Sequence, residues 1–279
     1  MKLITLNTHS LAEPDYENKL HLFADLILRE RPDVLALQEV NQTMAAEAVS
    51  VPKDLGFHSC PGLNVPVRSD NHAFRLAKLF REAGLACHWT WAPVKVGYEI
   101  YEEGLALFSR LPVEDTRQFF ISRSRSFSNW KTRKMVGILA GGQWFYSVHM
   151  GWWKDEEEPF ALQWDRALEE LETHRQDHMP MWVMGDFNSP CGVEGEGYGY
   201  VRRSGWQDTY DLAARRDSGI TVGKVIDGWR EEGAHQAGMR IDYIWCDRPV
   251  KVCSSQVICN GIHSPVVSDH YGIMITTES

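Results

Sequence analysis

The sequence predicts an α/β protein in which mixed β-sheets are covered by helices, and three observations lead to that class. Short apolar runs bounded by polar residues have the length and composition of buried strands. Longer segments between them repeat apolar residues at the spacing of a helix face. The two kinds of segment do not alternate strictly along the 279 residues, which disfavours a uniform parallel barrel.

Each predicted strand is preceded or followed by polar residues that interrupt its apolar run. The strand runs cover residues 3–6, 34–37, 144–148, 181–184, 243–245 and 271–275. The adjoining polar residues, in the same order, are Asn7, Glu39, His149, Asp186 with Asn188, Asp242, and Asp269 with His270. Because strand ends in such sheets meet along an edge, we expect these side chains to share one crevice.

Three amphipathic segments are predicted to be the helices that cover the sheets. The first has an apolar stripe from Leu20 to Leu28 and stops before a proline. The second has Asn71 as its N-cap and ends at Gly84. The third runs from Phe160 to His174, and the acidic stretch Asp155 to Glu158 is expected to form its first turn, where negative charge suits the helix dipole.

The composition is that of a soluble globular protein, with 43% hydrophobic and 24% charged residues. No linker, repeat or low-complexity tract divides the sequence, so we expect one domain over residues 1–279. The first apolar run is polar again by Asn7, and no apolar stretch is long enough for a membrane span, which predicts a cytoplasmic protein without a membrane partner. Six cysteines without a CxxC pair indicate neither a zinc site nor a disulfide framework.

The charge disfavours nucleic acid as a partner. Non-specific binding to nucleic acid draws on Lys and Arg, whereas this chain carries a formal net charge of -9. The exception is a basic run with Arg123, Arg125, Lys131, Arg133 and Lys134. Such a run is either a local binding patch or, more often, a solvated face.

The strand-end residues form a set suited to phosphoryl transfer. Their hard oxygens favour Mg²⁺, or Mn²⁺, over zinc, and Mg²⁺ uses few carboxylates, which leaves the other acids free as base or orienting groups. Phosphoryl transfer needs a cation, donors for the phosphoryl oxygens and a group that aligns water. Asp242 is expected to orient His270, and Glu103 to orient His149.

Each residue taken singly has a structural alternative. An Asp after a strand is more often a turn former or a helix cap, and His149 alone would more often be a satisfied interior imidazole. Their joint placement at so many strand ends is hard to obtain from turn chemistry, and it therefore favours catalysis.

The chain also resembles the endonuclease/exonuclease/phosphatase superfamily, through motifs that span nearly its whole length. In order, these are LNTHS, ALQEVNQ, SVHMGWW, MGDFNSP, RIDYIW and SDHYG. The resemblance implies a four-layer α/β/β/α sandwich, with two mixed sheets flanked by helices and the site at one edge. It implies that the metal ligands are Glu39, Asn7 and Asp269.

The same resemblance implies roles for the other motif residues. Asp186 would activate or align water, although His270 is an alternative base, and Asn188 would position the phosphate. His149 and His270 would contact the phosphoryl group, with support from Glu103 and Asp242 respectively.

Further segments resemble the bacterial branch of maltose 6'-phosphate phosphatases, and so imply a sugar-phosphate monoesterase. These segments are YEEGLALFSRLP, NWKTRKMVG, GWWKDEEEPF, GEGYGY, GWQDTYDLA and DSGITV. Trp130 and Trp152, with Trp153, either face a sugar or serve in packing. Arg133 either clamps phosphate or lies on a solvated face.

Two other functions stay open beside a small phosphorylated substrate. The first keeps the chemistry but uses a phosphodiester, as in nucleases or sphingomyelinase-like enzymes of the superfamily. The second is a binding protein that keeps the fold without catalysis, and it ranks last because the implied metal ligands are all present.

Overall fold

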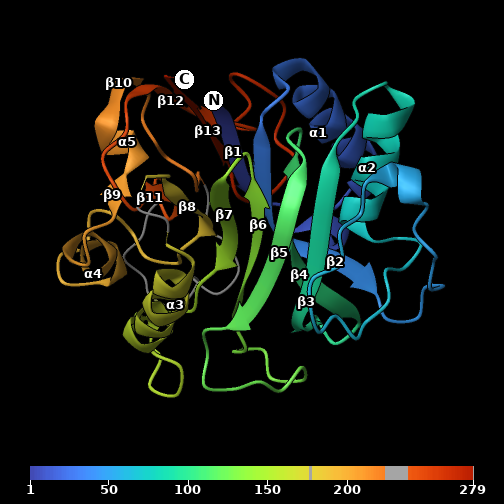
Figure 1. Cartoon of the computed structure of the whole chain (residues 1–279), viewed down its shortest axis with the longest axis horizontal. Helices are drawn as coiled ribbons and strands as arrows, with labels where there is room; N and C mark the ends of the chain where they lie inside the picture. Colours follow the sequence, from blue (N-terminus) through green and yellow to red (C-terminus); the bar gives the residue numbers. More distant parts are fainter. Residues whose placement is uncertain (176–177, 224–237, 279) are drawn as a thin grey trace.

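Two mixed β-sheets form the centre of the computed structural model, which describes residues 1–175, 178–223 and 238–278 (Figure 1). The strand order of the seven-stranded sheet is β10-β12-β13-β1-β2-β4-β3. Its strands are β1 (Lys2–Asn7), β2 (Val34–Thr43), β3 (His88–Gly97), β4 (Tyr101–Ser109), β10 (Ala213–Arg216), β12 (Val252–Ile258) and β13 (Gly272–Thr277). The predicted strands at 3–6, 34–37 and 271–275 are confirmed here.

The six-stranded sheet has the order β5-β6-β7-β8-β11-β9. Its strands are β5 (Val113–Phe120), β6 (Lys134–Ala140), β7 (Gln143–His149), β8 (Met181–Asp186), β9 (Gln207–Asp208) and β11 (Asp242–Cys246). Both sheets are mixed, because β1 runs parallel to β2 and β7 runs parallel to β8, whereas most other pairs are antiparallel. The predicted class of mixed sheets is therefore confirmed.

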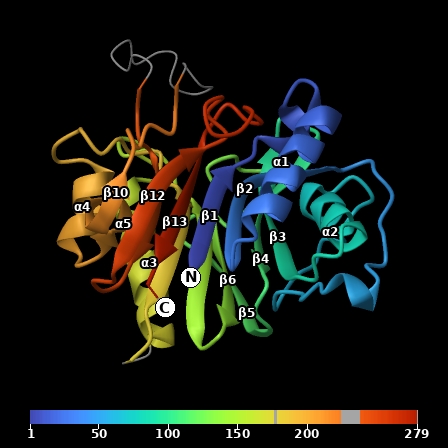
Figure 2. The ribbon, with the colours of Figure 1, turned by 90° about the horizontal axis from the view of Figure 1, so that it is seen from above.

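Helices cover the outer face of each sheet, which completes four layers. The first sheet is covered by α1 (Tyr16–Glu30) and α2 (His72–Glu82), and the second by α3 (Phe160–His174) and α4 (Gly197–Arg203) (Figure 1; Figure 2). The short helices are η1 (Ser10–Ala12), η2 (Lys53–Leu55) and α5 (Thr209–Leu212). The three large apolar clusters among the described residues lie between the layers, and the central one joins the two sheets through side chains such as Leu107, Phe145 and Trp182.

The three predicted helices are present with the expected ends. The side chain of Asn71 caps α2 by accepting a hydrogen bond from the amide of Phe74 at 3.0 Å. The acidic stretch, however, is not the first turn of α3, which begins at Phe160 after Pro159. The carboxylate of Glu158 instead accepts the amides of Arg123 and Ser124 at 2.7 and 2.6 Å, so this stretch anchors a neighbouring loop.

No helix in the described ranges is both long enough and apolar enough to cross a membrane.

A polar contact joins the two sheets close to the strand ends that carry the motif residues. The side-chain amide of Gln38 donates to the hydroxyl of Ser147 at 2.9 Å, and that hydroxyl donates to the carbonyl of Leu37 at 2.9 Å. Gly185 has φ 146°, and a Cβ there would lie 2.0 Å from the carbonyl oxygen of Val148. Only glycine therefore permits this approach of β8 to β7, directly before the residue that ends β8.

Candidate active site

A cavity of about 250 Å³ lies where the ends of strands from both sheets meet. Its walls hold ionisable or amide side chains and two tryptophans: His9, Glu39, Lys95, Glu103, Trp130, Arg133, His149, Trp152, Asp186, Asn188, Asp269 and His270. The strand pairing explains the gathering, because His149 of β7 and Asp242 of β11 are both register partners of Asp186 on β8. Six of the strand-end residues expected to share a crevice line this cavity, whereas Asn7 and Asp242 are fully buried and contact it through Glu39, Asp186 and His270.

Asp186 is the buried carboxylate to which the other groups point. Its Oδ1 accepts the amide of Asn188 at 2.8 Å, and its Oδ2 accepts the Nδ2 of Asn7 at 3.1 Å. The Nε2 atoms of His149 and His270 lie 3.5 and 3.8 Å from the same Oδ2. Burial raises the pKa of Asp186 to about 7, and the charge of His270 opposes that rise.

His270 has a carboxylate behind it. Its Nδ1 lies 3.0 Å from Oδ2 of Asp242, a fully buried residue, so the expected Asp242–His270 pair is present. Burial by itself would lower the pKa of His270, but the carboxylates of Asp242 and Asp186 raise it well above 6.5. The imidazole is therefore protonated at neutral pH.

His149 lacks such a partner. Its Nε2 lies 3.1 Å from the side-chain nitrogen of Asn188, and its Nδ1 has no hydrogen-bond partner among the described residues. Burial, followed by the charges of Arg133 and Lys95, lowers the pKa of His149 well below 6.5. This imidazole is neutral at pH 7.

Glu103, which was expected to orient His149, does not accept a hydrogen bond from it. Glu103 lies opposite Lys95 in the register of β3 and β4, and Oε1 of Glu103 is 3.3 Å from the Nζ of Lys95. Glu103 pairs with Lys95 because a buried ammonium group is stable only with an opposite charge beside it. The Nδ1 of His149 lies 3.8 Å from Oε1 of Glu39 instead.

Of the predicted metal ligands, Glu39 and Asp269 line the cavity, whereas Asn7 is fully buried beside them. The Nδ2 of Asn7 donates to Oε1 of Glu39 at 2.9 Å, and burial together with the charge of Glu103 raises the pKa of Glu39. Asp269 is held through its amide, which donates to Oε1 of Glu13 at 3.0 Å. These hard oxygens fit a divalent cation such as Mg²⁺, and the Oδ1 of Asn7 accepts the amide of His9 at 3.2 Å.

Clusters whose ligand atoms all lie within 4.8 Å of one another involve partly different residues. Among the described residues they are His9 with Glu13 and Asp269, and Asp186 with Asp242 and His270. The second is already joined by the imidazole–carboxylate pair. The first puts His9 beside Asp269, with its Nδ1 2.7 Å from Glu13, and the sequence analysis did not single out His9 although it lies within the LNTHS motif.

Several residues of the cavity hold a left-handed backbone, which side chains other than glycine rarely adopt. Glu39 has φ 51°, Asn188 φ 46°, His9 φ 47° and Tyr98 φ 48°. At Glu39 the cause is a β-bulge, because the register of β2 against β4 shifts between Leu37 and Val40. Such strain gathers at functional sites, where it aims side chains that regular strands would turn elsewhere.

The predicted substrate-binding residues Arg133, Trp130 and Trp152 also line the cavity. Arg133 is 5% exposed, and its Nη1 donates to the carbonyls of Trp130 and Thr132 at 3.0 and 3.2 Å. Trp130 and Trp152 are 57% and 36% exposed and line the cavity. Trp153, in contrast, packs against Phe160 and Tyr200, in the layer of α3 and α4.

The residues of the basic run lie in different surroundings: its two lysines have partners outside the cavity, Arg133 lines the cavity, and Arg123 and Arg125 are exposed. Lys131 pairs with Asp155 at 2.8 Å and with Glu157 at 3.0 Å. Lys134 donates to the carbonyl of Pro93 at 2.9 Å, outside the cavity. Lys95 was not predicted as a site residue. The sequence does mark it, because it is a charged residue within the largely apolar segment WTWAPVKVG.

The sequence and the fold match those of known proteins. The model of the Endonuclease/Exonuclease/phosphatase family matches residues 4–270. An endonuclease/exonuclease/phosphatase family protein from Leptotrichia buccalis C-1013-b has 28% identity and a TM-score of 0.84, with each chain covered over 100% of its length. No curated protein matches the chain.

Two more distant solved structures show the same fold. A mannosyl-6-phosphatase from Bacteroides thetaiotaomicron VPI-5482 has 13% identity and a TM-score of 0.67, with 100% of both chains covered. TDP2 from C. elegans has 15% identity and a TM-score of 0.63, covering 100% of this chain and 75% of its own.

Proposed function

Because this chain belongs to the Endonuclease/Exonuclease/phosphatase family, we propose that it is a metal-dependent hydrolase of phosphate esters, and that its substrate is a sugar phosphomonoester. One observation carries the proposal. Oδ2 of Asp186 lies 3.5 Å from one imidazole and 3.8 Å from another, inside a cavity whose walls also hold Glu39 and Asp269. One small substrate could therefore contact the proposed base Asp186, both imidazoles and the oxygens of the proposed metal ligands at the same time.

The two histidines and Asp186 have complementary roles in this proposal. Asp186, with a pKa raised to about 7, takes the proton of the attacking water near neutral pH. His270 stays protonated against Asp242 and stabilises the charge that develops on the phosphoryl oxygens. His149 is neutral and contributes hydrogen bonds only, together with Asn188.

Glu39, Asn7 and Asp269 would hold a divalent ion, Mg²⁺ by preference and Mn²⁺ as an alternative, which when bound supplies Lewis-acid stabilisation of phosphoryl charge. The strained backbone of Glu39 aims its carboxylate into the cavity. The Nδ2 of Asn7 donates to Glu39 and to Asp186, and so connects a proposed metal ligand with the proposed general base.

Three features support a sugar phosphate as the substrate. Exposed faces of Trp130 and Trp152 at the rim suit the C–H surface of a sugar ring, and Arg133 offers a guanidinium behind them. A cavity of about 250 Å³ suits a compact ligand. The mannosyl-6-phosphatase of similar fold lends further support to this substrate class.

The direct test is phosphate release from a panel that includes maltose 6'-phosphate and mannose 6-phosphate. Release is expected with added Mg²⁺, is abolished by EDTA, and returns when Mg²⁺ is restored. Bis(p-nitrophenyl) phosphate, plasmid DNA and sphingomyelin are run beside it, because the TDP2 fold relative makes a phosphodiester the second candidate. Cleavage of the diesters without phosphate release from any sugar phosphate would overturn the monoester proposal and favour a phosphodiesterase.

A further inference from the structure

Two buried cations stand together in the wall of the cavity. Lys95 is 8% exposed and Arg133 is 5% exposed, and both line the cavity beside His149. Lys95 has Glu103 as its ion-pair partner at 3.3 Å. Within the described part of the chain, Arg133 has no carboxylate within 4.0 Å and donates only to carbonyl oxygens, and its Nε is buried without a hydrogen-bond partner.

This pair is costly to keep in the folded protein. Burial and the nearby charge of Arg133 both lower the pKa of Lys95, and burial also lowers the pKa of Arg133. The carboxylates that face the two cations are Glu103, Glu39, Asp186 and Asp155, and only Glu103 forms an ion pair with either. Among the described residues Arg133 therefore lacks a close counterion, and this wall of the cavity suits an anion that enters it.

We infer that Lys95 and Arg133 together bind the non-bridging oxygens of a terminal phosphate, and that this subsite selects phosphomonoesters over phosphodiesters. The inference rests on the proposed hydrolysis of phosphate esters. Glu103 is a positioning residue in this scheme, because it fixes the ammonium group of Lys95 on β3 from its place on β4.

The chemistry of the two ester classes explains the selection. A monoester carries a charge near −2 at neutral pH and has three free oxygens, whereas a diester carries one charge and two free oxygens. A guanidinium fork beside a point charge can bind two of those oxygens while the third faces the carboxylates that line the cavity. The second substituent of a diester would instead be directed against the buried side chains of Lys95 and Arg133.

The test compares Lys95→Met with wild type on p-nitrophenyl phosphate and bis(p-nitrophenyl) phosphate, which share a leaving group. Loss of one charge-assisted hydrogen bond is expected to lower kcat/KM for the monoester by about 30- to 100-fold, chiefly through KM, and that for the diester by less than about threefold. An equal fall for both substrates, or no fall, would overturn the inference.

Two further variants keep the result interpretable. Lys134→Met is the matched control, because Lys134 follows Arg133 directly but binds Pro93 and Gln118 outside the cavity, and it should leave both activities unchanged. The double variant Lys95→Met/Glu103→Gln removes the buried carboxylate that the single change leaves unpaired. If the single variant unfolds, the double variant must show the same selective loss for the monoester.

Binding of inorganic phosphate separates this inference from the proposed function. Calorimetry in the presence of Mg²⁺ needs no turnover, and Lys95→Met should weaken phosphate binding at least about tenfold. If wild type hydrolyses neither ester yet shows this difference, the proposed function fails and the subsite stands. Equal phosphate binding by wild type and Lys95→Met would overturn the subsite even if the enzyme is active.

Discussion

The Nε2 atoms of His149 and His270 lie within 3.8 Å of the same carboxylate oxygen of Asp186, yet their surroundings shift the imidazole pKa in opposite directions. Burial disfavours the protonated form in both. His270 has Asp242 at 3.0 Å and is held protonated, whereas His149 has cations nearby and no ion pair closer than 3.5 Å. Burial alone would leave both imidazoles neutral; the carboxylates beside His270 outweigh its effect, whereas the cations near His149 add to it.

The largest effect should follow from removing the carboxylate that both imidazoles share. Asp186→Asn is expected to lower kcat by about 10³-fold or more, because the variant can neither accept the proton of water nor counter the charge of His270. The measurement is steady-state phosphate release at saturating Mg²⁺. Asp25→Asn, at an exposed position of α1, is the control, and activity of the Asp186 variant within tenfold of wild type would contradict the assignment.

Asp242→Asn tests what makes His270 differ from His149. Without this carboxylate the pKa of His270 drops, so the protonated imidazole is lost at lower pH than in wild type. We expect kcat at pH 7 to fall by about 10²- to 10³-fold, and the alkaline limb of the pH–rate profile to move to lower pH. A profile of unchanged shape would show that Asp242 does not control the charge of His270.

His149→Gln should have a smaller effect. The neutral imidazole contributes hydrogen bonds, so its loss is expected to lower kcat/KM by about 10- to 100-fold. The pH–rate profile should keep its shape, since His149 does not change its charge near neutral pH. A profile that lost its acidic limb in this variant would instead make His149 the titrating group.

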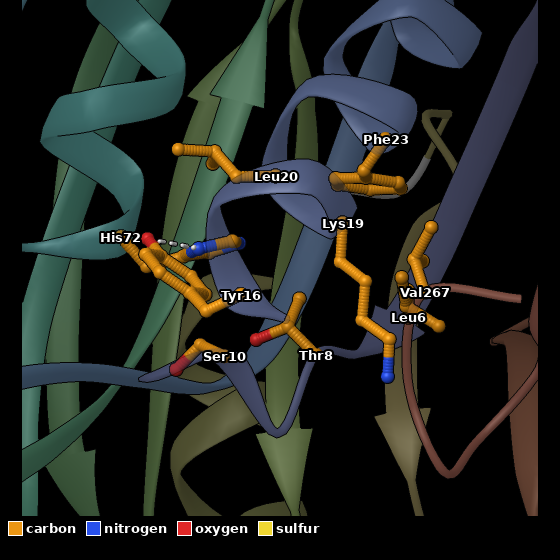
Figure 3. A pocket seen from close by; sticks show the side chains of 9 residues that line it. All are labelled: Leu6, Thr8, Ser10, Tyr16, Lys19, Leu20, Phe23, His72 and Val267. Atoms are coloured by element: carbon orange, nitrogen blue, oxygen red, sulfur yellow. Dashed lines mark hydrogen bonds between the residues drawn. The ribbon is translucent and has the colours of Figure 1, made fainter. Parts of the chain in front are cut away.

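A third buried histidine, His72, sharpens the comparison through stability. It lies in the packing between α1 and α2, where its Nδ1 is 3.0 Å from the hydroxyl of Tyr16 (Figure 3). Burial and the charge of Arg75 lower its pKa to about 3. The pKa of His72 is thus lower in the folded protein than the value near 6.5 in the unfolded chain. As pH falls from 6.5 toward 3, the unfolded chain binds a proton that the folded protein does not, so the free energy of unfolding decreases.

His72→Phe removes this titration and so should flatten the acid loss of stability. Between pH 6 and pH 4.5 the wild-type free energy of unfolding should fall by about 1.4 kcal/mol per pH unit more than that of the variant. Urea unfolding of the metal-free protein at several pH values measures the two slopes. His21→Phe, at an exposed position of α1, should keep the wild-type slope, and parallel slopes for His72→Phe would contradict the assignment.

The strands and helices were predictable because their periodicity is local. The apolar runs at 34–37 and 181–184 and the N-cap at Asn71 lie where expected, and the resemblance supplied the order of the layers. The grouping of the site residues followed from strand ends meeting at an edge, although their roles remain proposals.

Details that depend on long-range pairing were not predictable. Glu103 was expected to support His149, but a register shift in β3 between Pro93 and Lys95 puts a lysine opposite it. The acidic stretch was expected to begin a helix, but Glu158 accepts amides of Arg123 and Ser124, more than thirty positions earlier. Neither partner is visible in the local pattern, because each depends on tertiary packing.

The left-handed backbone at Glu39 and Asn188 lowers the stability of the fold in order to position two side chains of the candidate site. Each such conformation costs about 1–2 kcal/mol for a residue with a side chain, and glycine would remove that cost. At position 39 glycine would remove this cost together with a proposed metal ligand, and at position 188 it would also remove the hydrogen bond from Asn188 to the carbonyl of Met150. A side chain kept in this conformation is thus one whose use outweighs a local cost that every folded copy of the chain carries.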